Sequence, residues 1–396
     1  MNIQKLVVVT NVFGPLNLGD FELFSALVEK VHKCSDRVSL SAIARDPELS
    51  KGFFPRVAFY EQLGKAEGAG LRLLRLSASL LFVKWKFPAR VLLPKAQYDG
   101  LVELTKADLV MGCPGGFLED SSCSFYSHLI QVFLAKKLAK KYMLAPMSIG
   151  PVRNRINKFL LLKVLKGIDA IYVRERTSLR LCESLGVECK LSNDLAFDKF
   201  QNSVDSVASS SSYFCMTIID WSFPSAPDVA SARKAYLDAL SRTAVYVSRN
   251  FGLSLKIIVQ VASDMPAIKD FCALLDGQGV DYCLVTDDLT PDNMMNLISK
   301  ARLVIASRFH SAIFALNVGT PVIAISYLPK TTGMLDLYDA KELYVDIETV
   351  TSDRLINIAQ RFLLNPGEFL IIRSKFAKRL TEVGSVFVND LERVLS

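Results

Sequence analysis

At 396 residues the chain is too long for one core of ordinary size, so its length favours two domains of about 150 to 200 residues each. Hydrophobic residues make up 51% of the chain, enough for two cores, so a disordered chain is excluded. The net charge of +7 is moderate and could serve an anionic small substrate, an anionic membrane surface or nucleic acid; we do not expect nucleic acid as a partner.

The N-terminal apolar run "KLVVV" is soon interrupted by polar and turn residues, which is typical of neither a secretory signal nor a membrane-spanning helix. We therefore expect a cytoplasmic protein. The eight cysteines are scattered and form no CxxC pair, so we expect reduced, structural thiols and no metal site.

In the first half of the chain, apolar runs alternate with segments of helical periodicity. The runs are "KLVVVT", "RVSLSAIA", "ADLVMGC", "YMLAPMSIG" and "AIYVRE", and the clearest helical segments are "DFELFSALVEKVHKC" and "SHLIQVFLAKKLAKK". Continuous apolar strands that are each followed by a helix indicate a parallel sheet covered on both faces.

The second half repeats this plan from "YFCMTIID" to "PVIAISY", after the small polar stretch "QNSVDSVASSSS". The pattern predicts an α/β protein with two Rossmann-like, doubly wound domains facing a central cleft. We place the first domain at residues 1–200, the linker at 201–212, the second domain at 213–370 and a C-terminal helical segment at 371–396, which is expected to pack back across the first domain.

The segment from Gly70 to Lys95 mixes basic and apolar residues and contains no acidic residue. One interpretation is a helical hairpin that packs on the first domain. The alternative is peripheral contact with anionic lipid at the inner face of the plasma membrane, where Trp85 and Phe87 would insert shallowly. Arg72, Arg75, Lys84 and Lys86 would then supply the attraction.

The first glycine-rich turn contains Gly14, Asn17, Gly19 and Asp20, before a helix expected to start near Phe21. Glycines let the backbone approach a ligand, and a helix N-terminus offers N–H groups to an anion. Asp20 has two interpretations: it caps the helix, or it acts as a base on a substrate hydroxyl.

Two further turns follow strands of the first domain. In "ADLVMGCPGGFLEDSS", Gly115 and Gly116 precede Glu119 and Asp120, and adjacent glycines suit the approach of a bound molecule or of the next helix. In "MSIGPVRN" the simpler interpretation is an ordinary strand exit.

The most specific turn is in the second half, where "RLVIASRFH" places Arg308 and His310 after a buried strand and Lys330 follows the next strand. The carboxyl ends of neighbouring parallel strands meet at one edge of a sheet, so these side chains are expected to converge. An arginine fork, an imidazole and a point charge together predict an anion site.

These segments together resemble the polysaccharide pyruvyl transferase family. The resemblance rests on "GPLNLGDFELFSAL", "GCPGGFLEDSS", "SIGPVR", "YVRERTSLRLCESLGVECKLSNDLAFD" and "SRFHSAIFALNVGTPVIAISYLPKTTGML". It implies two Rossmann-like domains similar to those of GT-B glycosyltransferases, and transfer of a pyruvyl group from phosphoenolpyruvate to sugar hydroxyls. It also implies a cyclic ketal on a bacterial surface polysaccharide or its lipid-linked precursor. No step of this chemistry requires a metal or an organic cofactor.

The chemistry suggests a role for each candidate. Phosphoenolpyruvate is an anion, so we expect it to contact Arg308, His310 and Lys330, with His310 as the acid or the phosphate partner. Asp20 is the candidate base. On the acceptor side we expect substrate contacts from Asn17, Gly19, Gly115 and Gly116.

Two other functions stay open at this point. A nucleotide-sugar glycosyltransferase would share the architecture, and Asp336 and Asp339 could serve its ribose hydroxyls. A non-catalytic binding protein is disfavoured because the set of Asp20, Arg308, His310 and Lys330 is intact.

Overall fold

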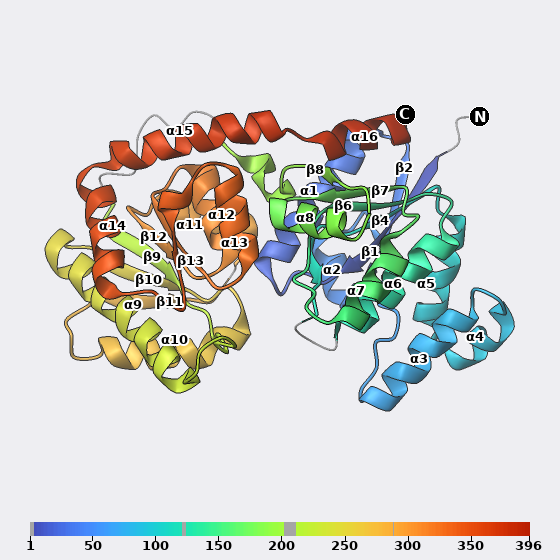
Figure 1. Ribbon diagram of the computed structural model, residues 1–396, viewed down its shortest axis with the longest axis horizontal. Helices are drawn as coiled ribbons and strands as arrows, with labels where there is room; N and C mark the ends of the chain where they lie inside the picture. Colours follow the sequence, from blue (N-terminus) through green and yellow to red (C-terminus); the bar gives the residue numbers. More distant parts are fainter. Residues whose placement is uncertain (1–3, 121–123, 202–210, 288) are drawn as a thin grey trace. The chain divides into compact units, whose positions relative to one another are not determined.

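The computed structural model describes residues 4–120, 124–201, 211–287 and 289–396. The chain divides into two compact units (Figure 1). Unit 1 comprises Met1–Leu195 and Val383–Ser396, and unit 2 comprises Ala196–Glu382.

The sheet of unit 1 is parallel, with strand order β3-β2-β1-β4-β6-β7-β8, and β5 also pairs with β6. Its central strands are apolar on both faces; Val7, Val8 and Val9 of β1, for example, are fully buried, as expected for a strand covered on both sides. The strands are β1 (Lys5–Val12), β2 (Val38–Ala44), β3 (Ala58–Glu61), β4 (Leu109–Gly112), β5 (Gly115–Leu118), β6 (Tyr142–Ile149), β7 (Ala170–Val173) and β8 (Lys190–Leu191).

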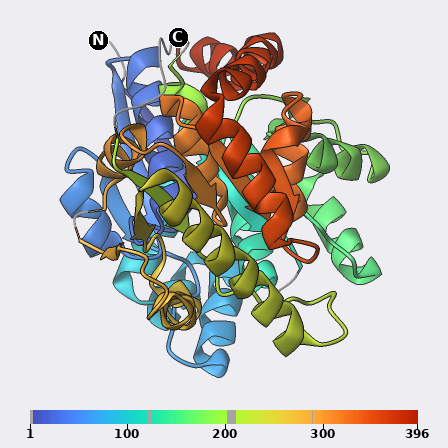
Figure 2. The ribbon, with the colours of Figure 1, turned by 90° about the vertical axis from the view of Figure 1, so that its left-hand side faces the viewer.

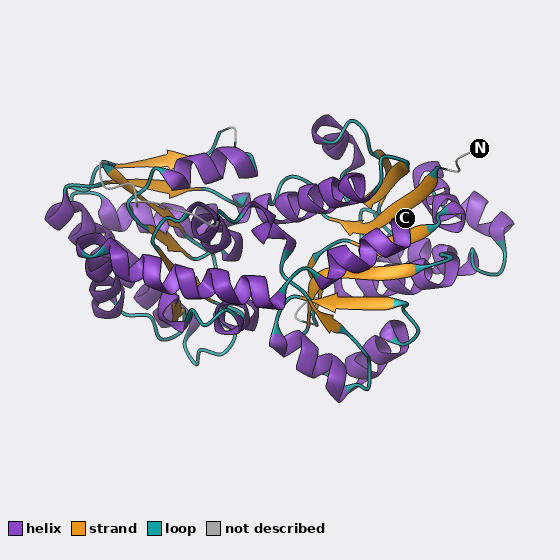
Figure 3. Ribbon diagram, turned by 90° about the horizontal axis from the view of Figure 1, so that it is seen from above, coloured by secondary structure: helices purple, strands orange, loops and turns teal. Residues whose placement is uncertain are grey.

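Helices cover both faces of this sheet (Figure 3). They are α1 (Leu18–Cys34), α2 (Pro47–Phe53), α3 (Ala69–Leu81), α4 (Lys86–Leu92), α5 (Lys95–Lys106), α6 (Ser124–Leu138), α7 (Arg155–Leu165), α8 (Arg176–Ser184) and, from the end of the chain, α16 (Val386–Leu395). The sequence predicts α1 and α6 correctly. It misses β5, because "GGFL" looks like a turn, whereas these residues add a short strand beside β6.

Unit 2 has a second parallel sheet, with strand order β11-β10-β9-β12-β13-β14. Its strands are β9 (Tyr213–Thr217), β10 (Ser254–Ile258), β11 (Tyr282–Val285), β12 (Val304–Ala306), β13 (Val322–Ser326) and β14 (Tyr344–Asp346). Its helices are α9 (Val229–Phe251), α10 (Met265–Leu275), α11 (Pro291–Ser299), α12 (Phe309–Val318), α13 (Pro329–Leu337), α14 (Ser352–Leu364) and α15 (Pro366–Val383), with short 3₁₀ turns at Leu195–Lys199, Ala262–Asp264 and Lys341–Leu343. Helices α9 and α14 lie side by side (Figure 2).

The division into units differs from the predicted boundaries at both ends of unit 2. Residues before the predicted linker already belong to unit 2, because Asn317 Nδ2 donates to the carbonyl oxygen of Ala196 at 2.7 Å. Most of the predicted linker, residues 202–210, lies outside the described residues.

The C-terminal segment expected at 371–396 is divided between the units rather than acting as one arm. Helix α15 stays with unit 2, where Arg373 Nε donates to the Leu316 carbonyl oxygen at 2.9 Å. Helix α16 returns to unit 1: Phe387 contacts the Tyr172 ring, and Tyr172 Oη donates to Asp390 at 2.7 Å. No helix among the described residues combines the length and apolar character needed to cross a membrane.

Strand order fixes where each unit can bind a ligand. In unit 1 the order reverses between β1 and β4, and in unit 2 it reverses between β9 and β12. The loops leaving the carboxyl ends of two such strands diverge to opposite faces of the sheet, so a crevice opens between them. The predicted turns at Gly14–Asp20 and at Arg308 both follow strands that border these points.

Candidate functional site

The candidate anion site of unit 2 begins where β9 and β12 end side by side. The backbone N–H of Arg308 donates to Thr217 Oγ1 at 3.3 Å, and the N–H of Ser307 donates to the Thr217 carbonyl oxygen at 3.1 Å. These bonds join the two loops that flank the switch point. Arg308 is the N-cap of α12.

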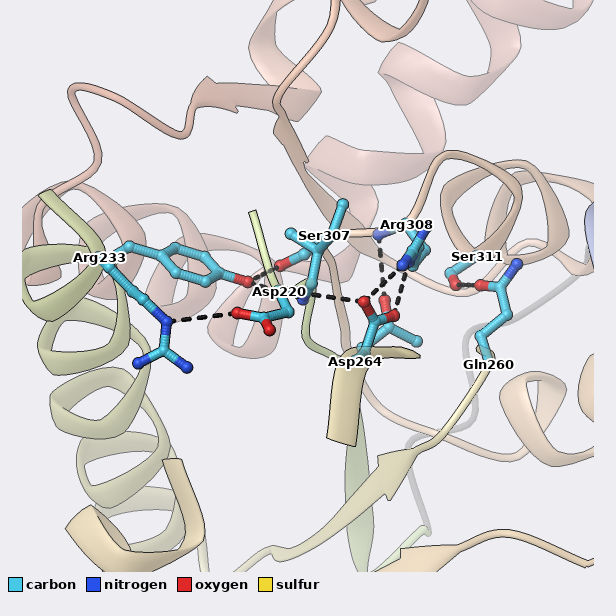
Figure 4. A network of polar contacts seen from close by, with 10 residues as sticks. Asp220, Arg233, Gln260, Asp264, Ser307, Arg308 and Ser311 are labelled. Carbon is cyan, nitrogen blue, oxygen red and sulfur yellow. Dashed lines mark hydrogen bonds and ion pairs between the residues drawn. The ribbon is translucent and has the colours of Figure 1, made fainter. Parts of the chain in front are cut away.

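The guanidinium of Arg308 is held by Asp264, which follows β10 (Figure 4). Arg308 Nε donates to Asp264 Oδ2 at 2.7 Å, and Nη2 donates to Oδ1. The Asp264 side chain is 2% exposed and that of Arg308 is 19% exposed. Burial opposes the charge on Arg308, but the bonds with Asp264 outweigh it and raise the pKa of the guanidinium. Two of the guanidinium nitrogens that were predicted to bind an anion, Nε and Nη2, thus already donate to Asp264.

Other polar side chains fix the loops around this ion pair. Tyr236 Oη lies 2.7 Å from Ser307 Oγ and accepts the N–H of Ile219 at 3.2 Å. Asp220 donates its N–H to Asp264 at 3.0 Å, and its carboxylate pairs with Arg233 (Figure 4). These contacts hold the loops around Arg308 in place and restrict the rotation of its guanidinium.

His310 and Lys330 both lie close to the ring of Phe309, the residue after Arg308. His310 is in the first turn of α12 and is 9% exposed, and its ring centroid lies 5.1 Å from that of Phe309. Lys330 is in the first turn of α13, with its Nζ 5.8 Å from the Phe309 centroid and 5.7 Å from that of Tyr327. The structure thus brings cationic groups from the β12 and β13 loops to one edge of the sheet.

Trp221 is a member of this region that the sequence analysis missed. It follows β9, and its ring centroid lies 4.9 Å from that of Tyr327. Its indole Nε1–H is buried and has no hydrogen-bond partner within the described part of the chain. An indole nitrogen can only donate, so a buried one without a partner points to a ligand acceptor. A tryptophan directly after the run "YFCMTIID" was the available signal.

In unit 1 the first turn has a different cap from the predicted one. Asn17, not Asp20, is the N-cap of α1: its Oδ1 accepts the N–H of Gly19 at 3.1 Å. The helix begins at Leu18, so Asp20 lies in its first turn. The Asp20 carboxylate is close to Gly115, with Oδ1 3.9 Å from where a Cβ on that glycine would be. Asp20 and Gly115 thus meet at the switch point.

Different structural constraints explain why glycine occupies the positions near this point. Gly115 has φ +152°, a backbone conformation that side chains disfavour, and a Cβ on Gly112 would lie 2.4 Å from Leu144. A Cβ on Gly116 would make only ordinary contacts, the nearest with Arg174 and Ser148 at 3.6 Å. Packing therefore explains Gly112, and backbone conformation explains Gly115.

Asp120, the second acidic residue after Gly115 and Gly116, has a structural role. Its carboxylate accepts the N–H groups of Arg153 and Asn154 at 3.0 Å and Nδ2 of Asn157 at 3.1 Å, just before and within α7. Burial pushes the pKa of Asp120 up, but these hydrogen bonds prevail and lower it. A carboxylate held in this way is a poor proton acceptor, which leaves Asp20 as the stronger candidate.

A buried histidine lies at the same edge of unit 1. β1 has an irregular register between Val9 and Val12, and Asn11 adopts a left-handed conformation with φ 61°. Its Nδ2 lies 3.3 Å from His128 Nδ1 on α6. The amide nitrogen is a donor, so Nδ1 accepts and the neutral ring carries its proton on Nε2. Burial, with a smaller contribution from Arg45, lowers the pKa of His128 to about 4.

The "VRERTS" and "ND" motifs form a buried network under this edge. Arg174 Nη1 pairs with Asp194 at 2.8 Å, and Arg174 Nε donates to Ser148 Oγ at 2.9 Å. Ser148 Oγ in turn donates to Glu175 at 3.0 Å, and burial raises the pKa of that carboxyl. These residues tie the ends of β6 and β7 together, a structural role.

The acidic pair that would suit a nucleotide ribose is placed elsewhere. Asp336 is in the last turn of α13, where its Oδ1 accepts a hydrogen bond from Tyr344 at 3.1 Å. Asp339 follows the helix and pairs with Arg379. Lys330 is at the opposite end of α13, so neither carboxylate adjoins the cationic edge.

Two Rossmann-like parallel sheets, each with candidate groups at its switch point, define the fold class of the GT-B glycosyltransferases. Solved structures agree on the fold. HepE of Anabaena, in complex with UDP and glucose, has a TM-score of 0.57 at 12% identity, over 98% of this chain and 97% of that one. A putative UDP-N-acetylglucosamine 2-epimerase from Listeria monocytogenes has a TM-score of 0.63 at 11% identity, over 98% and 94%.

The chain belongs to the polysaccharide pyruvyl transferase family, which matches residues 17–329. That range includes Asn17 and Asp20 of the first turn and Arg308 and His310 of unit 2, whereas Gly14 and Lys330 lie just outside it. A relative, the amylovoran biosynthesis protein AmsJ of Erwinia amylovora, is 21% identical over 383 residues, covering 86% of this chain and 88% of that protein.

Proposed function

We propose that this protein transfers the pyruvyl group of phosphoenolpyruvate to two hydroxyls of one sugar, forming a cyclic ketal on a surface polysaccharide or its lipid-linked precursor. Family membership supports pyruvyl transfer, and the relative named for amylovoran biosynthesis supports a saccharide acceptor. The observation that carries the donor assignment is the grouping of Arg308, His310 and Lys330 beside the switch point of unit 2.

The donor would bind through charge and directed hydrogen bonds. Arg308 offers its Nη1 group, because Nε and Nη2 are bound to Asp264. Lys330 supplies a point charge and Trp221 a neutral donor. Asp264 acts as a positioning residue: it fixes the plane of the guanidinium, and it offsets part of its charge, so that phosphate can leave after the reaction.

The first half of the reaction forms one carbon–oxygen bond. The hydroxyl oxygen of the acceptor bonds to C2 of phosphoenolpyruvate as Asp20 takes its proton, and His310 gives a proton to the C3 methylene, which becomes a methyl group. General acid and base groups of this kind contribute about 10² to 10⁴-fold each.

The second half closes the ketal. A second hydroxyl oxygen of the same sugar bonds to C2, and the bond between C2 and the phosphate oxygen breaks. In the net balance, one hydroxyl proton ends on the methyl group, and the other is released as the phosphate departs. The products are one ketal and one inorganic phosphate.

Mass spectrometry of surface polysaccharide tests this function directly. Cells that carry the gene should have repeating units heavier by one pyruvate ketal than cells that lack it, and a copy encoding Lys330→Gln should restore the ketal poorly. A copy encoding Lys341→Gln, an exposed lysine elsewhere in unit 2, should restore it fully. Identical polysaccharide with and without the gene would refute the proposal.

A further inference from the structure

Helices α3 and α4 form a hairpin, residues 69–92, at the margin of unit 1 and away from its strands (Figure 1). One side of this α3–α4 hairpin is anchored. Ala78, Phe82 and Ala89 belong to the buried core of the unit, and the Phe82 ring packs edge-on against Tyr98 of α5 at 5.5 Å. The interpretation of this segment as a helical hairpin that packs on the first domain is thus correct for its anchored side.

The opposite side of α3 is apolar and exposed. Leu73 and Leu80 are seven residues apart and so lie on one face, with Leu74 and Leu81 beside them. Buried Leu76, Ala78 and Ser79 lie on the other face. Leu73 is 66% exposed, although a soluble surface helix normally keeps its apolar stripe against a core.

The exposed apolar surface continues past α3. Val83, Trp85, Val91 and Leu92 are also exposed, Trp85 to 59% and Val91 to 72%. With Leu71 and the stripe on α3, this hairpin carries nine of the nineteen large hydrophobic side chains that are exposed among the described residues. A gathering of this kind marks an interaction surface, whereas scattered single residues would need no explanation.

Charge identifies the partner. Between Gly70 and Lys95 there are six basic residues and no acidic one, and Arg72, Lys84, Arg90 and Lys95 are exposed. A bilayer with anionic headgroups has negative charge above an apolar interior, and an apolar surface surrounded by positive charge alone is complementary to it. Exposed tryptophan suits the boundary between headgroups and acyl chains.

We propose that the α3–α4 hairpin docks unit 1 onto an anionic lipid bilayer, with its leucines and Trp85 inserted shallowly and its basic residues over the headgroups. If the proposed function holds, this docking brings the enzyme to an acceptor carried on a lipid. The docking itself depends only on the surface and can be tested without any catalytic assay.

Vesicle co-sedimentation tests the proposal with the full chain. Wild-type protein should bind vesicles of phosphatidylglycerol and phosphatidylcholine, should bind phosphatidylcholine alone much more weakly, and should be released by high salt. Arg72→Gln, Lys84→Gln and Arg90→Gln together should weaken binding about a hundredfold, since each charge contributes about fivefold. Leu73→Gln with Leu80→Gln should weaken binding to both kinds of vesicle, and glutamine preserves helix propensity.

Matched controls come from unit 2. Leu364→Gln with Ile371→Gln removes apolar side chains that are at least as exposed as Leu73 and Leu80, and Lys375→Gln with Lys378→Gln removes exposed charges, so both variants should bind like wild type. Circular dichroism should show every variant folded. Equal binding of hairpin variants and wild type, or no wild-type binding, would overturn the proposal. The proposal would also be overturned if the wild-type protein is a dimer and Leu73→Gln with Leu80→Gln converts it to monomers, because the exposed apolar surface would then bind a second copy of the chain. Phosphate release with a soluble saccharide reports on the proposed function separately.

Discussion

Asp264 receives two hydrogen bonds from Arg308, from Nε at 2.7 Å and from Nη2, across 44 residues of sequence. The carboxylate is almost completely buried, and the arginine is its charged partner. Removing one member of such a pair costs more than removing both, because the remaining charge is left in a low dielectric.

Arg308→Ala should therefore abolish phosphoenolpyruvate binding and also destabilise unit 2, by up to about 3 to 5 kcal/mol. Adding Asp264→Asn should recover most of the stability, because no buried charge remains, but it should not restore binding. Chemical denaturation and calorimetry with phosphoenolpyruvate measure the two effects. If the double variant binds the ligand like wild type, Arg308 is not part of the donor site.

Trp221→Phe should weaken phosphoenolpyruvate binding about tenfold to a hundredfold, because a hydrogen bond to a charged group contributes about 1.5 to 3 kcal/mol. Phenylalanine keeps an aromatic ring beside Tyr327 and lacks the N–H donor. The chain has two tryptophans, so Trp85→Phe leaves Trp221 as the sole tryptophan, and its fluorescence can be excited selectively over that of the tyrosines. Fluorescence of that variant that does not respond to phosphoenolpyruvate would argue against this contact.

Asp20→Asn should lower turnover about 10² to 10⁴-fold while leaving phosphoenolpyruvate affinity almost unchanged. Asn17 caps α1, so the cap stays intact, and the lost charge in the first turn costs at most about 1 kcal/mol. Steady-state kinetics with a melting curve separates the two roles. Wild-type turnover would show that the first turn is a scaffold, and Glu119 would be the next candidate base.

His128 makes unit 1 sensitive to acid. Unfolded histidine titrates near 6.5, whereas the folded pKa is about 4, so between these values the unfolded chain binds a proton that the folded chain does not. The stability due to neutral His128 is complete above pH 6.5 and falls by about 3 kcal/mol as the pH drops to 4. His128→Asn keeps an acceptor for Asn11 and removes the titration. Denaturation curves of wild type and variant should therefore converge toward acid pH, and parallel curves would contradict the assignment.

Much of the fold could be predicted because each buried strand of a parallel sheet is a continuous apolar run. "KLVVVT" and "PVIAISY" are examples, and both form strands where expected. The short strand β5 could not be predicted, because its two glycines suit a turn and its pairing depends on β6. The cap of α1 was assigned to Asp20, three residues too late, because both Asn17 and Asp20 are good capping types.

The candidate site was predictable only in part, for a related reason. Arg308, His310 and Lys330 follow neighbouring strands and so lie close together in the fold. Contacts between residues far apart in the sequence could not be predicted. Asp264, the partner of Arg308, follows β10, and the Asn11–His128 pair of unit 1 spans 117 residues, so no local pattern joins either pair.

The most direct test is the reaction of purified protein with phosphoenolpyruvate and saccharide from cells that lack the gene. We predict inorganic phosphate and pyruvate ketal in equal amounts, formed only when both substrates are present. Transfer of a sugar from a nucleotide sugar without phosphoenolpyruvate, or release of phosphate with no ketal on the saccharide, would contradict the account.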